Sequence, residues 1–245
     1  MCAHFTLKAK ATEIGNKFGI KISEELVFDF LVRGYIKTEL APIILAEKGK
    51  IVLKNAFFSL VPSWSNEFPC KFTTYNARLE RPNPKTGKTE YIYQVPTWKE
   101  SFNNAQTCLI PMSGAIESSY FGTEAGHMVK FSSKDQPFFY CLGLYNNWVN
   151  KSTGEVKETF TLLTDDPYKF FFDSGHDRSV LVINESSQEQ WLDDKAMSPE
   201  QRLQFIRKKR INLDWVVAKE RSLKDGWQKK APSTEEIKSI SVWKE

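Results

Sequence analysis

The chain opens with Met1-Cys2, which puts a thiol beside the N-terminus. Removal of Met1 would leave a free α-amine and a thiol on one residue. Both groups titrate close enough to neutral pH to supply a nucleophilic fraction. Together they can close a five-membered thiazolidine ring on an aldehyde. Cys2 is therefore a candidate nucleophile for carbonyl chemistry.

An amide and a guanidinium lie two residues apart in Tyr75-Asn76-Ala77-Arg78-Leu79-Glu80. Asn76 can donate a hydrogen bond to a sugar oxygen, and Arg78 can hold a phosphate through two parallel hydrogen bonds. The same pattern fits a solvated strand end at which Arg78 pairs with Glu80. Asn76 and Arg78 are thus candidate contacts to a sugar phosphate, with the surface ion pair as the alternative.

Two further segments carry groups that can move protons. Glu117 follows the apolar run at 108–116, where burial would let a carboxyl group act as a general acid and base. His176, in Ser174-Gly175-His176-Asp177-Arg178, is a proton carrier near neutral pH, and Arg178 is a second candidate phosphate contact. The alternatives are an exposed strand-end glutamate and a histidine that only forms a turn.

The composition sets the class of protein in which these residues lie. Of 245 residues, 41% are hydrophobic and 26% charged, which is typical of a globular chain and excludes extensive disorder. A net charge of +4 permits a nucleic-acid partner without requiring one. No apolar run approaches the roughly 18 residues that span a bilayer, and residues 1–10 lack the apolar core of a secretion signal. We therefore expect a cytoplasmic protein with no membrane partner.

The cysteines and histidines do not form a metal-binding pattern. The four cysteines are widely separated and include no C-x-x-C pair, and the three histidines are not spaced to complete a zinc site. We expect no metal, no cofactor and no disulfide framework. The four cysteines are Cys2, Cys70, Cys108 and Cys141.

Short apolar runs with turn residues between them indicate the elements that must position these groups. Strands are expected at 43–45, 51–53, 57–61, 108–111, 127–131, 138–144, 159–163 and 180–183. Helices are expected at 23–30 with Ser23 as cap, at 165–172, and at 199–210 after Ser198. These elements predict an α+β fold with a mainly antiparallel, barrel-like β core flanked by helices. We expect a single domain over 1–218, followed by a polar, basic tail or peripheral segment over 219–245.

Five motifs occur together in a fixed order. They are Met1-Cys2, then Phe58-Ser59-Leu60-Val61-Pro62-Ser63-Trp64, then Asn76-Ala77-Arg78 with Glu80, then Cys108-Leu109-Ile110-Pro111 leading to Gly114 and Glu117, and finally His176-Asp177-Arg178. In this combination the chain resembles the SRAP family, the SOS-response-associated proteins that crosslink to abasic sites, from Cys2 to about residue 183. Several motifs in register are far more specific than any one of them.

The resemblance implies a barrel-like α+β fold with a positively charged groove for single-stranded DNA. In such proteins the mature N-terminal cysteine, here Cys2, attacks the aldehyde of a ring-opened abasic site. By analogy Asn76 holds the opened sugar, Glu117 shuttles protons, and His176 assists in closing or reversing the link. The residues assigned to DNA contacts are Arg78 and Arg178 at the phosphates, Trp64 as a stacking face, and His4 where the family has an arginine.

The resemblance thus predicts an abasic-site processing protein that acts in DNA damage repair. It would bind single-stranded DNA as a monomer, associate with the nucleoid when bound, and form a thiazolidine DNA–protein crosslink through Cys2. Autoproteolytic, peptidase-like removal of Met1 and an abasic-site lyase side activity are part of the same expectation. The alternatives are a non-covalent single-stranded DNA-binding module and an N-terminal nucleophile amidohydrolase.

The sequence departs from the family pattern at several positions. The family's Met-Cys-Gly-Arg opening is Met1-Cys2-Ala3-His4 here, and His4 would make a phosphate contact dependent on pH. The aromatic residues that flank the family's glutamate are Ile116 and Ser118, and its Trp-Gly pair is Phe58-Ser59. Because Cys2, Asn76, Glu117 and His176 all persist, we expect a divergent member with retained activity.

Overall fold

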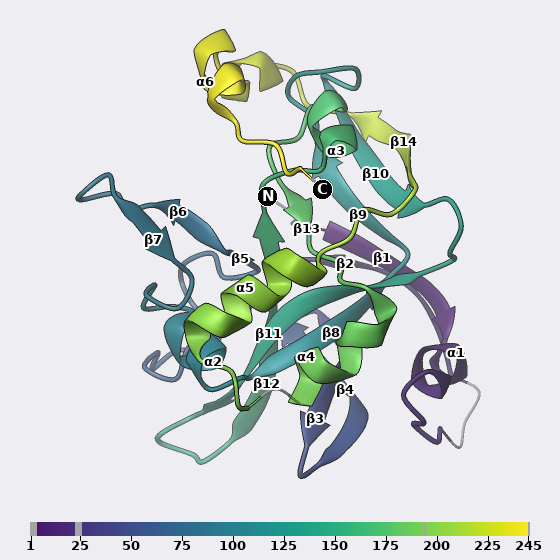
Figure 1. Cartoon of the computed structure of the whole chain (residues 1–245), viewed down its shortest axis with the longest axis vertical. Helices are drawn as coiled ribbons and strands as arrows, with labels where there is room; N and C mark the ends of the chain where they lie inside the picture. Colours follow the sequence, from purple (N-terminus) through teal and green to yellow (C-terminus); the bar gives the residue numbers. More distant parts are fainter. Residues whose placement is uncertain (1–3, 23–25, 194, 245) are drawn as a thin grey trace.

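The computed structural model describes residues 4–22, 26–193 and 195–244 (Figure 1). The strands are β1 (His4–Lys10), β2 (Val27–Arg33), β3 (Leu40–Glu47), β4 (Lys50–Phe58), β5 (Asn76–Arg78), β6 (Glu80–Pro82), β7 (Thr89–Tyr91), β8 (Thr107–Met112), β9 (Gly114–Ser118), β10 (His127–Ser133), β11 (Phe139–Val149), β12 (Val156–Asp165), β13 (Ser179–Val180) and β14 (Trp215–Ser222). The helices are α1 (Ala11–Asn16), α2 (Lys99–Asn103), α3 (Lys169–Asp173), α4 (Gln188–Asp193), α5 (Pro199–Lys209) and α6 (Thr234–Ser239), with 3₁₀ helices η1 (Glu185–Ser187) and η2 (Trp227–Lys230).

Five strands close into a small barrel. Going around it, β11 pairs with β8, β8 with β3, β3 with β4, β4 with β12, and β12 with β11 again. All of these pairs are antiparallel except β12 with β4. Strand β8 is buried at every position, which explains its continuous apolar run. Closure leaves no free edge within this ring.

A second sheet of five strands packs on the barrel in the order β14-β10-β9-β1-β2. Its apolar side chains, among them Phe5, Val129 and Phe131, share one cluster with Phe58 and Leu162 of the barrel. The chain passes from the barrel to this sheet at Ser113, between β8 and β9. Ala115, two residues before Glu117 on β9, belongs to the same cluster.

Helices α2, α4 and α5 cover another face of the barrel (Figure 1). Trp191 of α4 is fully buried, and its Nε1 donates to the carbonyl oxygen of Cys108 at 2.9 Å. The Thr107 hydroxyl in turn donates to the carbonyl oxygen of Trp191 at 2.7 Å. Helix α5 buries Leu203 and Ile206 in the same cluster. These contacts fix β8, and through it the start of β9.

The predicted fold class is confirmed: the protein is an α+β protein with a mainly antiparallel, barrel-like core. Strands β3, β4, β8, β10, β11 and β12 contain or overlap the expected runs, α3 overlaps the helix expected at 165–172, and α5 lies within the helix expected at 199–210. Ser198 caps α5 in a reciprocal capping box with Gln201, as the Ser-Pro-Glu start predicted.

Three expected elements were wrong. The helix expected at 23–30 is replaced by strand β2, because alternating side chains of 27–33 face the core while the strand pairs with β1; its expected cap, Ser23, lies outside the described residues. The run at 57–61 leaves strand geometry at Ser59, where φ is 139°. The run at 180–183 is a strand only over β13.

Strand β14 continues four residues past the boundary expected at residue 218, pairing with β10 as far as Ser222. None of the helices in the described ranges is long and apolar enough to cross a membrane. Cys70, Cys108 and Cys141 are free and buried. Within residues 4–22, 26–193 and 195–244 no group of three or more His, Cys, Asp or Glu side chains is arranged to hold a metal ion.

Candidate active site

The centre of the site is a buried contact between a carboxyl group and an imidazole. Glu117 lies on β9 and is 4% exposed, and His176, in the loop after α3, is 3% exposed. Nε2 of His176 is 3.3 Å from Oε2 of Glu117. The structure therefore brings together two residues that are 59 positions apart and that the sequence assigned to proton transfer.

Two interlocked turns hold His176 against Glu117. Gly175 has φ +99°, and a Cβ there would overlap the carbonyl oxygen of Phe121. Gly122 faces the carbonyl of Asp173 in the same way, and Tyr120 N donates to Gly175 O at 3.1 Å. Only glycine fits so close an approach of two backbones. The turn after β9 and the loop after α3 thus act as one support.

The hydrogen bonds of His176 determine which nitrogen carries the proton. Nδ1 lies 3.2 Å from the carbonyl oxygen of Ser118, which can only accept, so Nδ1 donates. In the neutral imidazole, Nε2 is then the acceptor that faces Glu117. Burial lowers the pKa of His176, although the charge of Glu117 opposes this effect. Nε2 is thus the nitrogen through which His176 can exchange a proton with the Glu117 carboxyl group.

A group of charges adjoins this pair. Asp177 Oδ2 is 3.6 Å from Nε of Arg178. Burial raises the pKa of Asp177, but the charges of His176, Arg178 and Arg78 outweigh it and hold that pKa below its usual value. Arg178 follows Asp177 directly in the segment that carries His176.

Strand β5 positions Asn76 and Arg78, which are two residues apart and so point to the same face. The strand runs parallel to β12, with Asn76 opposite Leu162. Arg78 Nη2 pairs with Asp166 Oδ1 at 2.8 Å, whereas Glu80 pairs with Arg207. The alternative Arg78–Glu80 ion pair is thus not formed, and the guanidinium of Arg78 is held by a partner 88 residues away.

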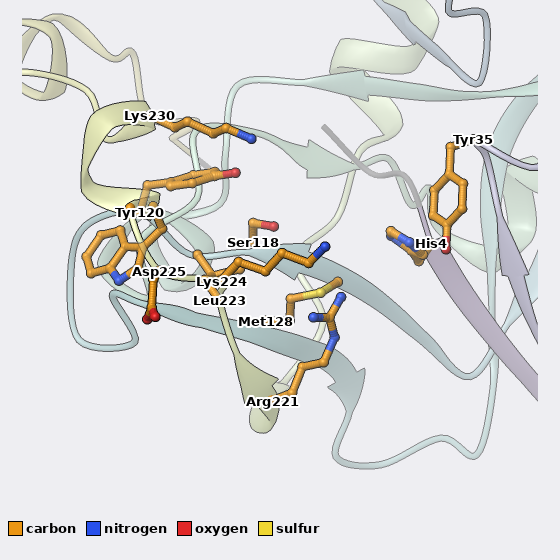
Figure 2. A pocket seen from close by; sticks show the side chains of 12 residues that line it. His4, Tyr35, Ser118, Tyr120, Met128, Arg221, Leu223, Lys224, Asp225 and Lys230 are labelled. Carbon is orange, nitrogen blue, oxygen red and sulfur yellow. The ribbon is translucent and has the colours of Figure 1, made fainter.

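His4 begins β1 opposite Ile116 of β9, immediately before Glu117. Its ring meets Tyr35 edge to face, with centroids 5.2 Å apart. Burial lowers the pKa of His4, an effect that Glu117 opposes and Arg221 reinforces. Figure 2 shows His4 and Tyr35 on one side of a cavity of about 400 Å³.

A second cavity, of about 610 Å³, is lined by His176, Asp177 and Arg178. Tyr120 and Lys230 line both cavities. The two cavities therefore lie side by side, one at His4 and one at His176.

Trp64 is placed elsewhere, in the loop between β4 and β5. It is 50% exposed and stacks on Phe72 with centroids 5.7 Å apart and an interplanar angle of 12°. Its Nε1 donates to the carbonyl of Pro96 at 3.2 Å. Trp64 lines neither cavity, so its flat exposed face is separate from the proton-transfer pair.

Sequence reasoning missed the contribution of the C-terminal segment. Arg221, Lys224 and Lys230 line the cavity at His4, beside Tyr120. The sequence signal was only a polar, basic composition after residue 218, which says nothing of where a segment packs. The predicted nucleophile, Cys2, lies outside the described residues, as does Ala3.

Comparisons with known proteins agree with this architecture. A protein from Bacteroides thetaiotaomicron has a similar solved structure, with 22% identity, a TM-score of 0.70, and 98% of this chain and 100% of that chain covered. A protein from Bordetella bronchiseptica is also similar, with 19% identity and a TM-score of 0.64, and the match covers 89% of this chain and 99% of that chain. A phage-related protein from the same organism has 14% identity, a TM-score of 0.61, and 89% and 93% covered. At these identities the likeness establishes the fold alone.

None of the curated proteins matches the sequence. A protein-family model does match it, over residues 1–221, which is most of the chain. The chain therefore belongs to the SRAP family, described as SOS response associated peptidase.

Proposed function

We propose that this protein crosslinks to abasic sites in single-stranded DNA through the mature N-terminal Cys2. Membership of the SRAP family supports a DNA-associated, abasic-site-related function in general. The observation that carries the finer proposal is the buried contact between Glu117 and His176. Glu117 follows Ile116, which pairs with His4 at the start of β1. His4, the first described residue, is two positions from Cys2 and is opposite Ile116, next to Glu117.

The chemistry needs a proton carrier at several steps. The α-amine of Cys2 adds to the C1′ aldehyde of the opened abasic sugar, and the carbinolamine loses water to give an imine. The Cys2 sulfur then adds to the imine carbon, and its proton ends on nitrogen, which closes the thiazolidine. A carboxyl–imidazole pair can protonate the departing water and accept protons from nitrogen and sulfur. Glu117 and His176 are assigned these transfers.

The remaining residues are assigned to binding. Asn76 holds the opened sugar, and Arg78 and Arg178 bind the neighbouring phosphates. The positive charges of Arg78 and Arg178 both lower the pKa of Asp177, the residue after His176, and Arg178 contacts Asp177 directly. This supports binding of a phosphate beside the reacting sugar. His4 is assigned a phosphate contact in its protonated form. Trp64, stacked on Phe72, offers an exposed face to a base farther along the strand.

Two further reactions belong to the proposal, one before the imine forms and one after it. Hydrolysis of the Met1–Cys2 bond exposes the α-amine, and we include its autocatalytic form in the proposal. An imine that the thiol has not yet trapped permits β-elimination of the 3′ phosphate, which is lyase activity. The balance between crosslink and cleavage then depends on how fast the Cys2 thiol adds.

The test is a denaturing gel of tag-free protein with a single-stranded oligonucleotide that carries one abasic site. We expect a slow band that survives SDS, with an intact mass equal to the sum of both components less one water. Cys2→Ala keeps an α-amine but should give no stable band, while some strand cleavage persists. An intact oligonucleotide is the control, and no band with a confirmed free Cys2 would refute the crosslinking function.

The second candidate is non-covalent binding of single-stranded DNA on the same fold. The half-exposed Trp64–Phe72 stack favours it, because stacked aromatic faces accept unpaired bases without chemistry. Dependence of binding on salt would be similar for both functions. Only a denaturation-resistant product separates them, so retention of DNA in a native gel without an SDS-stable band would favour this candidate.

A further inference from the structure

The C-terminal segment beyond β14 builds part of the site. The family model ends at residue 221, yet residues 223–227 and 230 line the cavity at His4, and residues 229–232, 236 and 240 line the cavity at His176. Figure 1 shows this segment leaving β14, rising to α6 and returning to the body of the molecule. The walls of both cavities therefore include chain that the family model does not cover.

Both ends of the segment are attached to the core. At its start, Leu223 N donates to Gly126 O at 2.8 Å, and the Trp227 indole packs against Gly126. At its end, Trp243 N donates to Pro167 O at 2.9 Å, and its ring lies 4.6 Å from the Arg210 guanidinium. The segment is thus held across the site rather than left in solvent.

This segment places ammonium groups at the cavity. In Figure 2 the side chains of Lys224 and Lys230 extend from the segment toward the space that His4 faces from the opposite side, and Arg221 points into the same space. Asp225 lines the cavity too, but its carboxylate points away from these two lysines (Figure 2). Neither Lys224 nor Lys230 forms an ion pair with another of the described residues, and both lysines are exposed.

We propose that Lys224 and Lys230 bind two phosphates of the single-stranded DNA that the proposed function brings to Glu117 and His176. Lys230 lines both cavities, so a strand that passes from His176 to His4 runs beneath its ammonium group. A flexible ammonium is suited to a phosphate whose position varies with DNA sequence. Each cavity is lined by three lysine or arginine side chains, but the cavity at His4 has one carboxylate, Asp225, and the cavity at His176 has two, Asp177 and Glu236. The cavity at His4 is therefore the more cationic of the two.

The test is binding of an intact fluorescent single-stranded oligonucleotide, measured by anisotropy from 50 to 200 mM NaCl. Each single-strand phosphate contact contributes about 0.7 to the slope of log K against log salt. The double variant Lys224→Ala/Lys230→Ala should therefore make the slope shallower by about 1.4. It should also weaken binding equally for two unrelated base sequences. Lys50→Ala/Lys238→Ala removes the same charge from exposed positions outside both cavities and should leave the slope unchanged.

The outcomes separate this inference from the function on which it rests. The salt slope is measured for the lysine variant, and crosslinking to abasic DNA is measured in parallel for wild type. An unchanged slope in that variant would overturn the inference and leave crosslinking intact. A reduced slope with no crosslink by wild type would keep the phosphate contacts and refute the crosslinking function. Failure of wild type to bind the oligonucleotide would overturn both.

Discussion

Glu117 is the residue whose replacement separates chemistry from binding. Glu117→Gln keeps the side-chain volume and leaves an amide that can donate to Nε2 of His176, but it cannot exchange a proton. We expect crosslinking under single-turnover conditions to slow by about a hundredfold or more, as for loss of a general acid and base. Affinity for intact DNA should stay within about twofold of wild type. Glu155→Gln in the turn between β11 and β12 is the matched control; equal rates for the two variants would exclude proton transfer by Glu117.

His176 couples the site to the pH dependence of stability. Burial lowers the pKa of His176 in the folded protein. Just below pH 6.5, the usual pKa, this histidine is therefore protonated in the unfolded chain but stays neutral in the folded protein. Stability contributed by the neutral imidazole is thus present at pH 7.5 and is lost as pH falls below 6.5, by at most about 1.4 kcal/mol per pH unit.

His176→Gln should flatten the curve of unfolding free energy between pH 7 and 5.5, measured by urea titration. Part of the slope remains in that variant, because burial lowers the pKa of His4 as well. Asp165, whose pKa burial raises to about 6, contributes with the opposite sign in both proteins and cancels in the difference. His127→Gln serves as comparison. A slope identical to wild type in His176→Gln would contradict the inferred neutral imidazole.

The interlocked turns supply the prediction at the scale of elements. Gly175→Ala puts a Cβ where the Phe121 carbonyl lies, in a backbone with φ +99°, and we expect it to cost about 3 kcal/mol or more of folding free energy. Gly154, in the turn between β11 and β12, has φ +74° and open space around it, so Gly154→Ala should cost only about 1–2 kcal/mol. Urea midpoints of the two variants give the comparison, and equal costs would show that the turns do not interlock.

The end of α2 carries a residue of the wrong type for its conformation. Ala105 has φ 52° and completes a Schellman motif. In this motif the backbone N–H of Ala105 donates to the carbonyl of Phe102, and that of Gln106 donates to the carbonyl of Ser101. Ala105→Gly should raise stability by about 1 kcal/mol, or about 2–4 °C in Tm. The φ of Asn104 is already negative, so Asn104→Gly should bring no gain in stability. A calorimetric scan of both variants decides the matter; a lower Tm for Ala105→Gly would show that its methyl group packs usefully.

The elements also show what the sequence could predict. Burial alternates along Val27–Arg33, but the sequence of this strand does not, because exposed Val27 and Leu31 are apolar too, and the cap-like Ser23 favoured a helix. The sequence of strand β1 does alternate, at Phe5, Leu7 and Ala9, so its signal was present. Helix α5 was predictable because its cap, Ser198, is local. Contacts between distant segments have no such local signature.

For the molecule as a whole, motif order predicted the family and singled out Glu117 and His176, which lie in contact, whereas the packing of distant segments could not be predicted. Parallel pairing of β12 with β4 closes the barrel across about a hundred residues, and nothing in either strand specifies the other. The ion pair of Arg78 with Asp166 likewise replaces the nearer partner Glu80. The basic composition after residue 218 gave the charge of the C-terminal segment but not its place over the two cavities.

That placement depends on Trp243, which packs edge-on against Tyr168 with centroids 5.3 Å apart and lies over the Arg210 guanidinium. Trp243→Ala removes both contacts, each worth about 0.5–2 kcal/mol. Because local opening exposes backbone to proteases, we expect limited trypsin digestion to cut after Lys224, Lys229 or Lys230 at least several-fold faster than in wild type. Trp64→Ala, which alters an aromatic pair outside both cavities, should leave these cuts at the wild-type rate. Equal rates in Trp243→Ala and wild type would mean that β14 and Trp227 alone hold the segment over the site.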